Sequence, residues 1–128
     1  MQIVKVHTDK APKAIGPYSQ AIVTGGMVYT SGQIPINPIT GLVEGNNISE
    51  QAEIVFSNLQ EVLAAANSSL KRVVKTTCFL SDMADFSAFN EVYAKYFTTN
   101  PARSCVAVKS LPKNVLVEVE VIALTNDD

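Results

Sequence analysis

Two stretches of the chain show apolar residues at the spacing of an amphipathic helix, and we assign both apolar stripes to the core. The first helix begins at Ser49, a good N-cap residue, and ends near Asn67, a residue suited to a helix C-terminus. The second begins at Ser81 and is stopped by Pro101. The stripes comprise Ala52, Val55, Phe56, Leu59, Val62, Leu63 and Ala66 in the first helix, and Phe86, Phe89, Tyr93 and Phe97 in the second.

Further segments have the alternation or the β-branched content of strands. Gly25 and Gly26 supply the positive φ angles of a tight hairpin turn between the second strand and the third. The order β-β-β-α-β-α-β-β predicts an α+β fold, with a six-stranded, mostly antiparallel sheet and two helices on one face. The predicted strands are Ile3–His7, Ala21–Thr24, Met27–Ser31, Val73–Leu80, Ser104–Lys109 and Leu116–Thr125.

The last predicted strand has two unlike faces. Every second residue is apolar, and we assign that face to the helix-covered core. The opposite face is partly apolar, and no predicted helix remains to cover it. A second copy of the chain is the simplest cover, so the pattern predicts an oligomer. The core face carries Val117, Val119, Val121 and Ala123, and the other face carries Leu116, Glu118, Glu120, Ile122 and Leu124.

Composition agrees with an oligomer. The chain of 128 residues fits a single domain that spans its whole length. Hydrophobic residues make up 47% of it and charged residues only 17%, against a usual charged share of about 25%. A small domain has a large surface for its volume, so a chain short of charges is expected to hide part of that surface.

Charge and cysteine usage narrow the function classes. The net charge of −2 disfavours nucleic-acid binding, which normally leaves a basic footprint. No window of about 18 apolar residues predicts a membrane span, and the alternating start of the chain does not resemble a signal peptide. Cys78 and Cys105 have no partners at zinc-ligand spacing, so we expect a reduced, cytoplasmic protein, with a single disulfide left open.

We interpret the last two strands as a hairpin with its turn near residues 111–113. Arg103 and Cys105 then share a half-buried face with Glu118 and Glu120. Two interpretations stay open: a cross-strand ion pair at an oligomer interface, or an anion-binding arginine beside a carboxylate that acts as general base. The same register assigns Val106 and Val108 to the core.

Few other residues point to chemistry. His7 is the only histidine, and we expect it to be a strand or surface residue. Cys105 has no histidine placed beside it, so we expect a small packed residue rather than a nucleophile. Asn90 falls on the apolar stripe of the second helix and needs a polar partner. Ser31 and Gly32 offer a hydroxyl and an open backbone N–H to an anion. The chain has no glycine-rich phosphate loop, metal cluster or dinucleotide fingerprint.

Short motifs spread along nearly the whole chain carry a resemblance when they are taken together. In order, they are AIGPYSQ at 14–20, TSGQIP at 30–35, PARSCV at 101–106, LPK at 111–113 and VEVE at 117–120. Each motif is modest alone. The set, in this order and spacing, resembles the reactive intermediate deaminase family, RidA, also called YjgF.

The resemblance implies a chorismate-mutase-like α+β fold and a homotrimer with clefts between its subunits. It also implies hydrolysis of reactive enamines and imines, among them 2-aminoacrylate, 2-iminopropanoate and 2-iminobutanoate, to 2-keto acids and ammonia. Such a deaminase needs no cofactor and no metal. Its ligands are small 2-imino and 2-keto acids.

The resemblance also implies roles for single residues. Arg103 resembles the family's anchor for the substrate carboxylate, and Gly32 would offer that carboxylate a backbone N–H. Glu118 resembles the acid that activates or orients water, and Glu120, on the same face, is left ambiguous. Asn90 resembles a residue contributed across the subunit boundary. The remaining cleft residues implied by the resemblance are Tyr18, Ser31 and Cys105.

Other function classes stay open. Members of this family have long been labelled ribonucleases or translation inhibitors, but the pI near 5.3 and the single histidine argue against a dedicated endoribonuclease. A non-catalytic trimer that binds small carboxylates, or acts as a chaperone, would use Arg103 as well. A chorismate-mutase-type activity is suggested by fold analogy alone. Turnover of an imine substrate distinguishes the deaminase from all of these.

Overall fold

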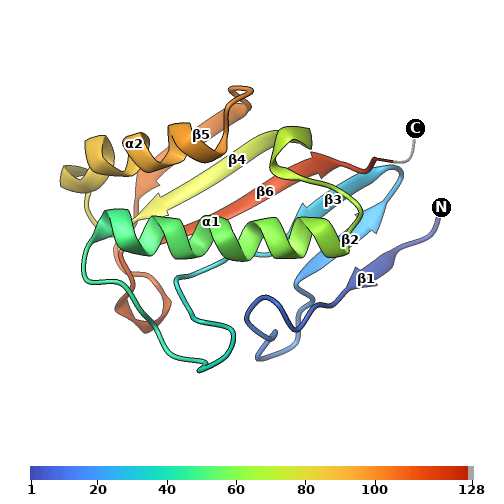
Figure 1. Ribbon diagram of the computed structural model, residues 1–128, viewed down its shortest axis with the longest axis horizontal. Coiled ribbons are helices and arrows are strands. Elements are labelled where there is room, and N and C mark those ends of the chain that lie inside the picture. Colours follow the sequence, from blue (N-terminus) through green and yellow to red (C-terminus); the bar gives the residue numbers. More distant parts are fainter. Residues whose placement is uncertain (127–128) are drawn as a thin grey trace.

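The computed structural model describes residues 1–126. The six strands in that range form one sheet, and both helices lie on the same face of it (Figure 1). The element order matches the predicted β-β-β-α-β-α-β-β, so the α+β class and the arrangement of layers are confirmed. The elements are β1 (Val4–Val6), β2 (Ala21–Thr24), β3 (Met27–Thr30), α1 (Ile48–Ala65), β4 (Val73–Leu80), α2 (Phe86–Tyr96), β5 (Ala102–Ala107) and β6 (Val117–Leu124).

The strands lie side by side in the order β1-β2-β3-β6-β4-β5. β6 therefore lies between β3 and β4 and runs antiparallel to both, whereas β4 and β5 run parallel. The predicted hairpin of the last two strands is wrong. The chain returns through α2 to place β5 at the sheet edge beside β4, because a parallel neighbour requires such a helical crossover.

The N-cap of α1 is Asn47 rather than the predicted Ser49. The Asn47 side-chain oxygen accepts a 2.9 Å hydrogen bond from the backbone N–H of Glu50. The Glu50 carboxylate in turn accepts a 2.8 Å bond from the N–H of Asn46, which completes a reciprocal cap. At the other end, Asn67 follows the C-cap with a φ of 58°, the left-handed conformation that ends many helices.

The predicted Gly25-Gly26 turn is confirmed. Both glycines have positive φ, 57° and 76°, and Thr24 pairs with Met27 across the turn. This turn sets the register of β3, and β3 leads directly into the segment that carries Ser31.

The core lies between the two helices and one face of the sheet. The β6 residues predicted to face the helices are buried, none of them more than 2% exposed. Phe56, in the middle of α1, has no exposed surface and packs edge-on against Tyr93 of α2. Aromatic rings bury large areas, so this contact ties α1 to α2 and to the strands beneath. The rings around Phe56 are Phe89, Tyr93, Tyr96 and Phe97.

No helix among residues 1–126 covers the other face of the sheet, which we call the open face (Figure 1). Tyr29 of β3 is 44% exposed there and Val106 of β5 is 46% exposed. The assignment of Val106 and Val108 to the core was wrong. The register of β5 on β4 sets Val106 level with Phe79, on the open face, and Val108 is only half-buried. A partly apolar, uncovered sheet face is the kind of surface that another chain covers.

Truncation of Phe56 tests the tie between the helices. Removing a buried phenylalanine side chain costs about 3–5 kcal/mol, so the free energy of unfolding of Phe56→Ala should fall by that amount in urea denaturation. Ser57→Ala, on the exposed side of α1, is the matched control and should stay within about 0.5 kcal/mol of the parent. A loss below about 1 kcal/mol in Phe56→Ala would contradict its central place in the core.

Candidate functional site

Arg103 lies near the start of β5, on the helix-covered face of the sheet. It is level with Thr76 of β4, which is fully buried. The guanidinium lies over the ring of Tyr93, 4.6 Å from its centroid, and 5.6 Å from the ring of Phe86. Its Nη1 donates a 2.7 Å hydrogen bond to the side-chain oxygen of Asn90. α2 therefore holds the guanidinium through both ring contacts and a hydrogen bond.

The Tyr93 ring beneath the guanidinium is itself fixed. Its hydroxyl shares a buried 2.8 Å hydrogen bond with the hydroxyl of Thr76. Burial raises the pKa of Tyr93, so this hydroxyl stays protonated at neutral pH. β4 thus sets the position of the ring, and Arg103 rests on a support that cannot rotate freely.

A hollow of about 340 Å³ opens beside Arg103. No Asp or Glu from the described part of the chain lines it. A guanidinium has several N–H donors in a planar fork, and Asn90 takes one of them. The remaining donors match a carboxylate in a two-point contact. The lining residues are Asn90, Tyr93, Ala94, Phe97, Asn100, Pro101 and Arg103.

Cys105 lies on the same face as Arg103, directly opposite Cys78 of the neighbouring strand. Both cysteines are free. Burial raises the pKa of Cys78 to about 12, and it also raises the pKa of Cys105. A protonated thiol is a poor nucleophile, which agrees with the prediction that Cys105 is a packed residue.

Glu118 lies on β6, on the open face of the sheet, where it is level with Phe79 of β4. Gly32 passes directly over its carboxylate, and a Cβ at that position would collide with Glu118 Oε2. A larger residue at position 32 would displace the Glu118 side chain from this position. Burial and the charge of Glu120 raise the pKa of Glu118. A carboxylate with a raised pKa accepts a proton more readily, as a general base must.

The segment after β3 brings Ser31 and Gly32 to β6. Gln33 exchanges two backbone hydrogen bonds with β6, of 2.9 and 3.1 Å. The Ser31 hydroxyl donates a 2.6 Å bond to the Ser19 carbonyl and so ties down the loop that carries Tyr18. Tyr18 is 52% exposed, and with Gly32 it lines a second hollow of about 380 Å³. Ser31 supports this loop, whereas Tyr18 offers its side chain to the hollow.

The arginine and the glutamate lie on opposite faces of one chain's sheet. Arg103 is level with Thr76 on the helix-covered face, and Glu118 is level with Phe79 on the open face. The predicted convergence of the arginine and the thiol with the two glutamates is therefore wrong within a single chain. β4 separates β5 from β6, and side chains alternate between faces along every strand.

Asn90 accepts its hydrogen bond from Arg103 of its own chain. The role across a subunit boundary that the resemblance implies for Asn90 stays a prediction. Thr76 was missed, and its only signal is a hydroxyl at a core-facing position of a strand. Tyr93 was assigned to the core and is buried there, but it also supports the guanidinium. One chain thus carries two separate groups of candidate residues, which we call the Arg103 half-site and the Glu118 half-site.

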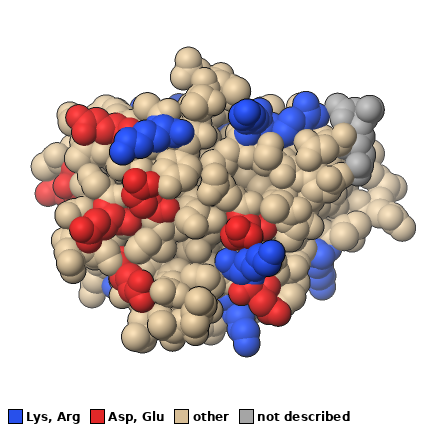
Figure 2. Space-filling view, viewed as in Figure 1, with Lys and Arg blue, Asp and Glu red and all other residues tan. Residues whose placement is uncertain are grey.

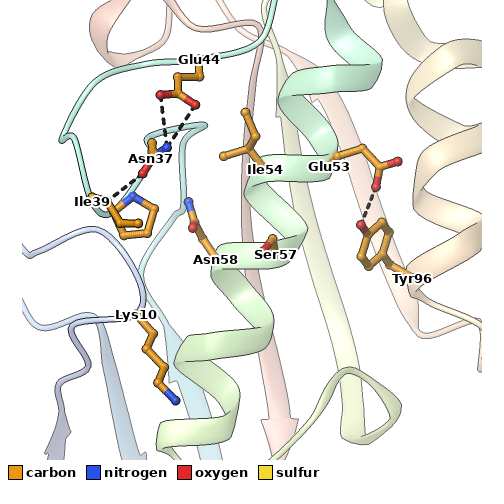
Figure 3. Close-up of a pocket in the computed structure, with 10 residues that line it drawn as sticks. Lys10, Asn37, Ile39, Glu44, Glu53, Ile54, Ser57, Asn58 and Tyr96 are labelled. Atoms are coloured by element: carbon orange, nitrogen blue, oxygen red, sulfur yellow. Dashed lines mark hydrogen bonds between the residues drawn. The ribbon is translucent and has the colours of Figure 1, made fainter.

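A further hollow, of about 420 Å³, lies on the outer side of α1 (Figure 3). Both of its carboxylates have partners: Glu44 accepts hydrogen bonds from Asn37, and Glu53 accepts one from the Tyr96 hydroxyl. Within residues 1–126, no three His, Cys, Asp or Glu side chains gather as a metal site would require. We assign no function to this hollow.

Comparison with known proteins gives the same family by sequence and by structure. The family described as Endoribonuclease L-PSP matches residues 8–125. Protein MMF1, mitochondrial, of Saccharomyces cerevisiae is 53% identical over 123 residues, which cover 95% of this chain and 84% of that protein. The Rid family protein YyfA of Yersinia pestis has a TM-score of 0.94 at 47% identity, covering 97% of this chain and 100% of that chain. Escherichia coli TdcF, solved with bound serine, has a TM-score of 0.90 at 41% identity, covering 96% and 99%.

The chain therefore belongs to the RidA/YjgF family, the one described as Endoribonuclease L-PSP. The resemblance carried by the sequence motifs is confirmed, and so is the fold that it implied for a single chain. The names within the family differ, so the activity of this chain is argued from its own residues.

The pKa of Glu118 should respond to Glu120. The negative charge of Glu120 favours the protonated form of Glu118, so Glu120→Gln should lower that pKa. Carbon-13 NMR titration of the assigned side-chain carboxyl measures the midpoint directly. Glu61→Gln, on α1 across the sheet, is the matched control and should leave the midpoint unchanged. An unchanged midpoint in Glu120→Gln would contradict the coupling of the two carboxylates.

Proposed function

We propose that this chain hydrolyses reactive 2-enamine and 2-imino acids, such as 2-aminoacrylate, 2-iminopropanoate and 2-iminobutanoate, to 2-keto acids and ammonia. The observation that carries the proposal is the fixed guanidinium of Arg103 beside an open hollow. Every such substrate has a carboxylate next to its electrophilic carbon, so a fixed guanidinium orients that carbon. The relative TdcF was solved with serine, which also carries a carboxylate, and this supports a cleft of the same kind.

A complete site of this kind requires two copies of the chain. The two half-sites of one chain lie on opposite sides of its sheet, where one small substrate cannot reach both. In the proposed homotrimer, the open face of each copy packs on the next. Arg103 and Asn90 of one copy then meet Glu118, Gly32 and Tyr18 of its neighbour. A closed ring gives identical clefts, and the same contact buries the apolar part of the open face.

The proposed reaction adds water and releases ammonia. An enamine first takes a proton at C3 and becomes a protonated imine. Water attacks C2 while Glu118 accepts a proton from it, which gives a neutral carbinolamine. Glu118 returns that proton to the nitrogen, the C–N bond breaks, and ammonia leaves as the hydroxyl loses its proton to form C=O. Arg103 and the Gly32 N–H hold the carboxylate throughout.

RNA cleavage is the second candidate, because the family is described as an endoribonuclease. RNA binding draws on clustered positive charge. The net charge here is −2, and Lys and Arg are scattered among Asp and Glu on the helix-bearing face (Figure 2). His7, the single histidine, pairs with Asp9 on an exposed surface. These observations favour the deaminase. A trimer that only binds carboxylates differs from it by the lack of turnover.

The cytoplasmic location expected from the sequence stays a prediction. One relative, from Saccharomyces cerevisiae, is named as mitochondrial. None of the helices within residues 1–126 is long and apolar enough to cross a membrane.

Replacement of Arg103 tests the proposed anchor. In an assay that couples a threonine dehydratase to hydrolysis of 2-iminobutanoate, Arg103→Ala should lower kcat/KM at least about 100-fold, because binding and orientation are lost together. Arg103→Lys keeps the charge without the planar fork and should retain about a tenth of the activity. Light scattering should show that both variants still form trimers. Full activity in Arg103→Ala would refute the anchor, and no turnover by the parent would refute the deaminase.

Mixing two inactive variants tests whether each site draws on two chains. Arg103→Ala and Glu118→Gln chains are unfolded together in equal amounts and refolded. In a ring of three, each cleft takes its arginine from one chain and its glutamate from the next. Each of these two residues therefore has an independent chance of about one half of being intact. About a quarter of the parent activity should therefore return.

The matched control mixes the parent with the double variant Arg103→Ala/Glu118→Gln. Clefts shared between chains again give about a quarter of the parent activity in this mixture. If each site lies within one chain, the first mixture should have no activity and the second should have about half of the parent activity. That second pair would exclude the shared cleft.

A further inference from the structure

Two hollows beside the Glu118 half-site join into one trough. The first, of about 380 Å³, contains Gly32 and Tyr18, and the second, of about 300 Å³, extends to residues 37–41. The loops that follow β1, β3 and β5 form the trough, and they lie together below α1 in Figure 1. Five residues line both hollows: Pro12, Lys13, Ile15, Ile36 and Lys113.

The walls of the trough are largely apolar. Ile15 is 79% exposed and Ile39 is 93% exposed, which leaves two large aliphatic side chains open to solvent. Ile34 and Ile36 extend the apolar lining toward Gly32. Large apolar side chains that gather around a concave surface mark a ligand-binding groove. The trough therefore suits the carbon chain of a ligand whose reacting end lies near Gly32.

The charge on the trough is entirely positive. Lys13 and Lys113 line both hollows, and no Asp or Glu among the described residues lines either. Neither lysine side chain makes an ion pair within residues 1–126. The hollow in Figure 3 differs, because Glu44 and Glu53 line it together with Lys10. In a chain with a net charge of −2, a pair of uncompensated lysines at one groove favours an anionic ligand.

The backbone of Lys113 adds an independent sign that this loop is constrained. Its φ of 55° and ψ of 22° are left-handed, and Asn114 follows with a φ of 55°. This conformation is unfavourable for a residue with a Cβ. Backbone bonds from Asn114 to Leu111 and from Val115 to Pro112 hold the turn. Such residues persist where the surroundings fix them, and they are enriched at ligand-binding sites.

We propose that the trough holds the side chain of the substrate, and that Lys13 and Lys113 select side chains that end in a carboxylate. The preferred substrates are then 2-imino diacids whose second carboxylate lies a few methylene groups from the reacting carbon. The methylene groups lie along the isoleucines, and the second carboxylate meets the ammonium groups. This proposal rests on the proposed deaminase, because Gly32 contacts the first carboxylate there.

Binding of product keto acids tests this selection without unstable imines. Isothermal titration calorimetry of the intact oligomer compares 2-oxohexanedioate with 2-oxohexanoate, which lacks the terminal carboxylate. The diacid should bind about five- to tenfold more tightly, as two solvent-exposed charges allow. Lys13→Met/Lys113→Met should abolish this preference, so that the two keto acids bind with equal affinity. Lys71→Met, an exposed lysine outside the trough, is the matched control and should keep the preference.

Equal affinity for the two keto acids in the parent, or a preference that survives in the double variant, would overturn the selection. Turnover of 2-iminobutanoate is measured separately on the same preparation. A chain that turns over the imine but binds both acids equally has the deaminase activity without the selection. A chain without turnover that still prefers the diacid would refute the deaminase alone.

Discussion

Strand pairing with β4 determines on which face of the sheet each candidate residue lies. It is flanked by β5 on one side and β6 on the other, and side chains alternate between faces along all three strands. Arg103 is level with Thr76 and Glu118 is level with Phe79, so the pairing sends the two charges to opposite faces. A slip of one residue on β6 would turn Glu118 into the apolar core. The need for a second chain in the proposed site therefore follows from strand register, which the core itself enforces.

The contacts that hold the Arg103 side chain form on folding, before a ligand binds. Holding a long, flexible side chain in one conformation costs up to about 2 kcal/mol of entropy. The contact with the Tyr93 ring contributes about 0.5–2 kcal/mol, and the hydrogen bond to Asn90 contributes about 1 kcal/mol. These two contributions together are of the same size as the entropic cost of holding the side chain. The side chain is therefore fixed on folding, and ligand binding does not have to supply that cost. A carboxylate then meets a guanidinium that is already oriented, which is the condition for catalysis by positioning.

The sequence predicted which helices and strands form better than it predicted which strands lie side by side. The stripes of α1 and α2 and the alternation of β6 depend on local periodicity, and all are confirmed. The β5–β6 hairpin failed because strand order depends on long-range pairing, which a turn between two strands does not reveal. One signal was present: the helix between β4 and β5 has the length of a parallel crossover. The partner of Asn90 was out of reach for the same reason, since it depends on the face that Arg103 occupies.

In the proposed oligomer, two opposing effects would act on Glu118. A second chain over the open face removes water and raises a pKa that burial and Glu120 have already raised. The guanidinium brought by that chain lowers it, because a nearby positive charge favours the ionised carboxylate. A bound substrate carboxylate offsets the charge of the guanidinium, but the protonated imine beside it brings a positive charge of its own. That charge favours the ionised form of Glu118, which is the form that accepts a proton when water attacks.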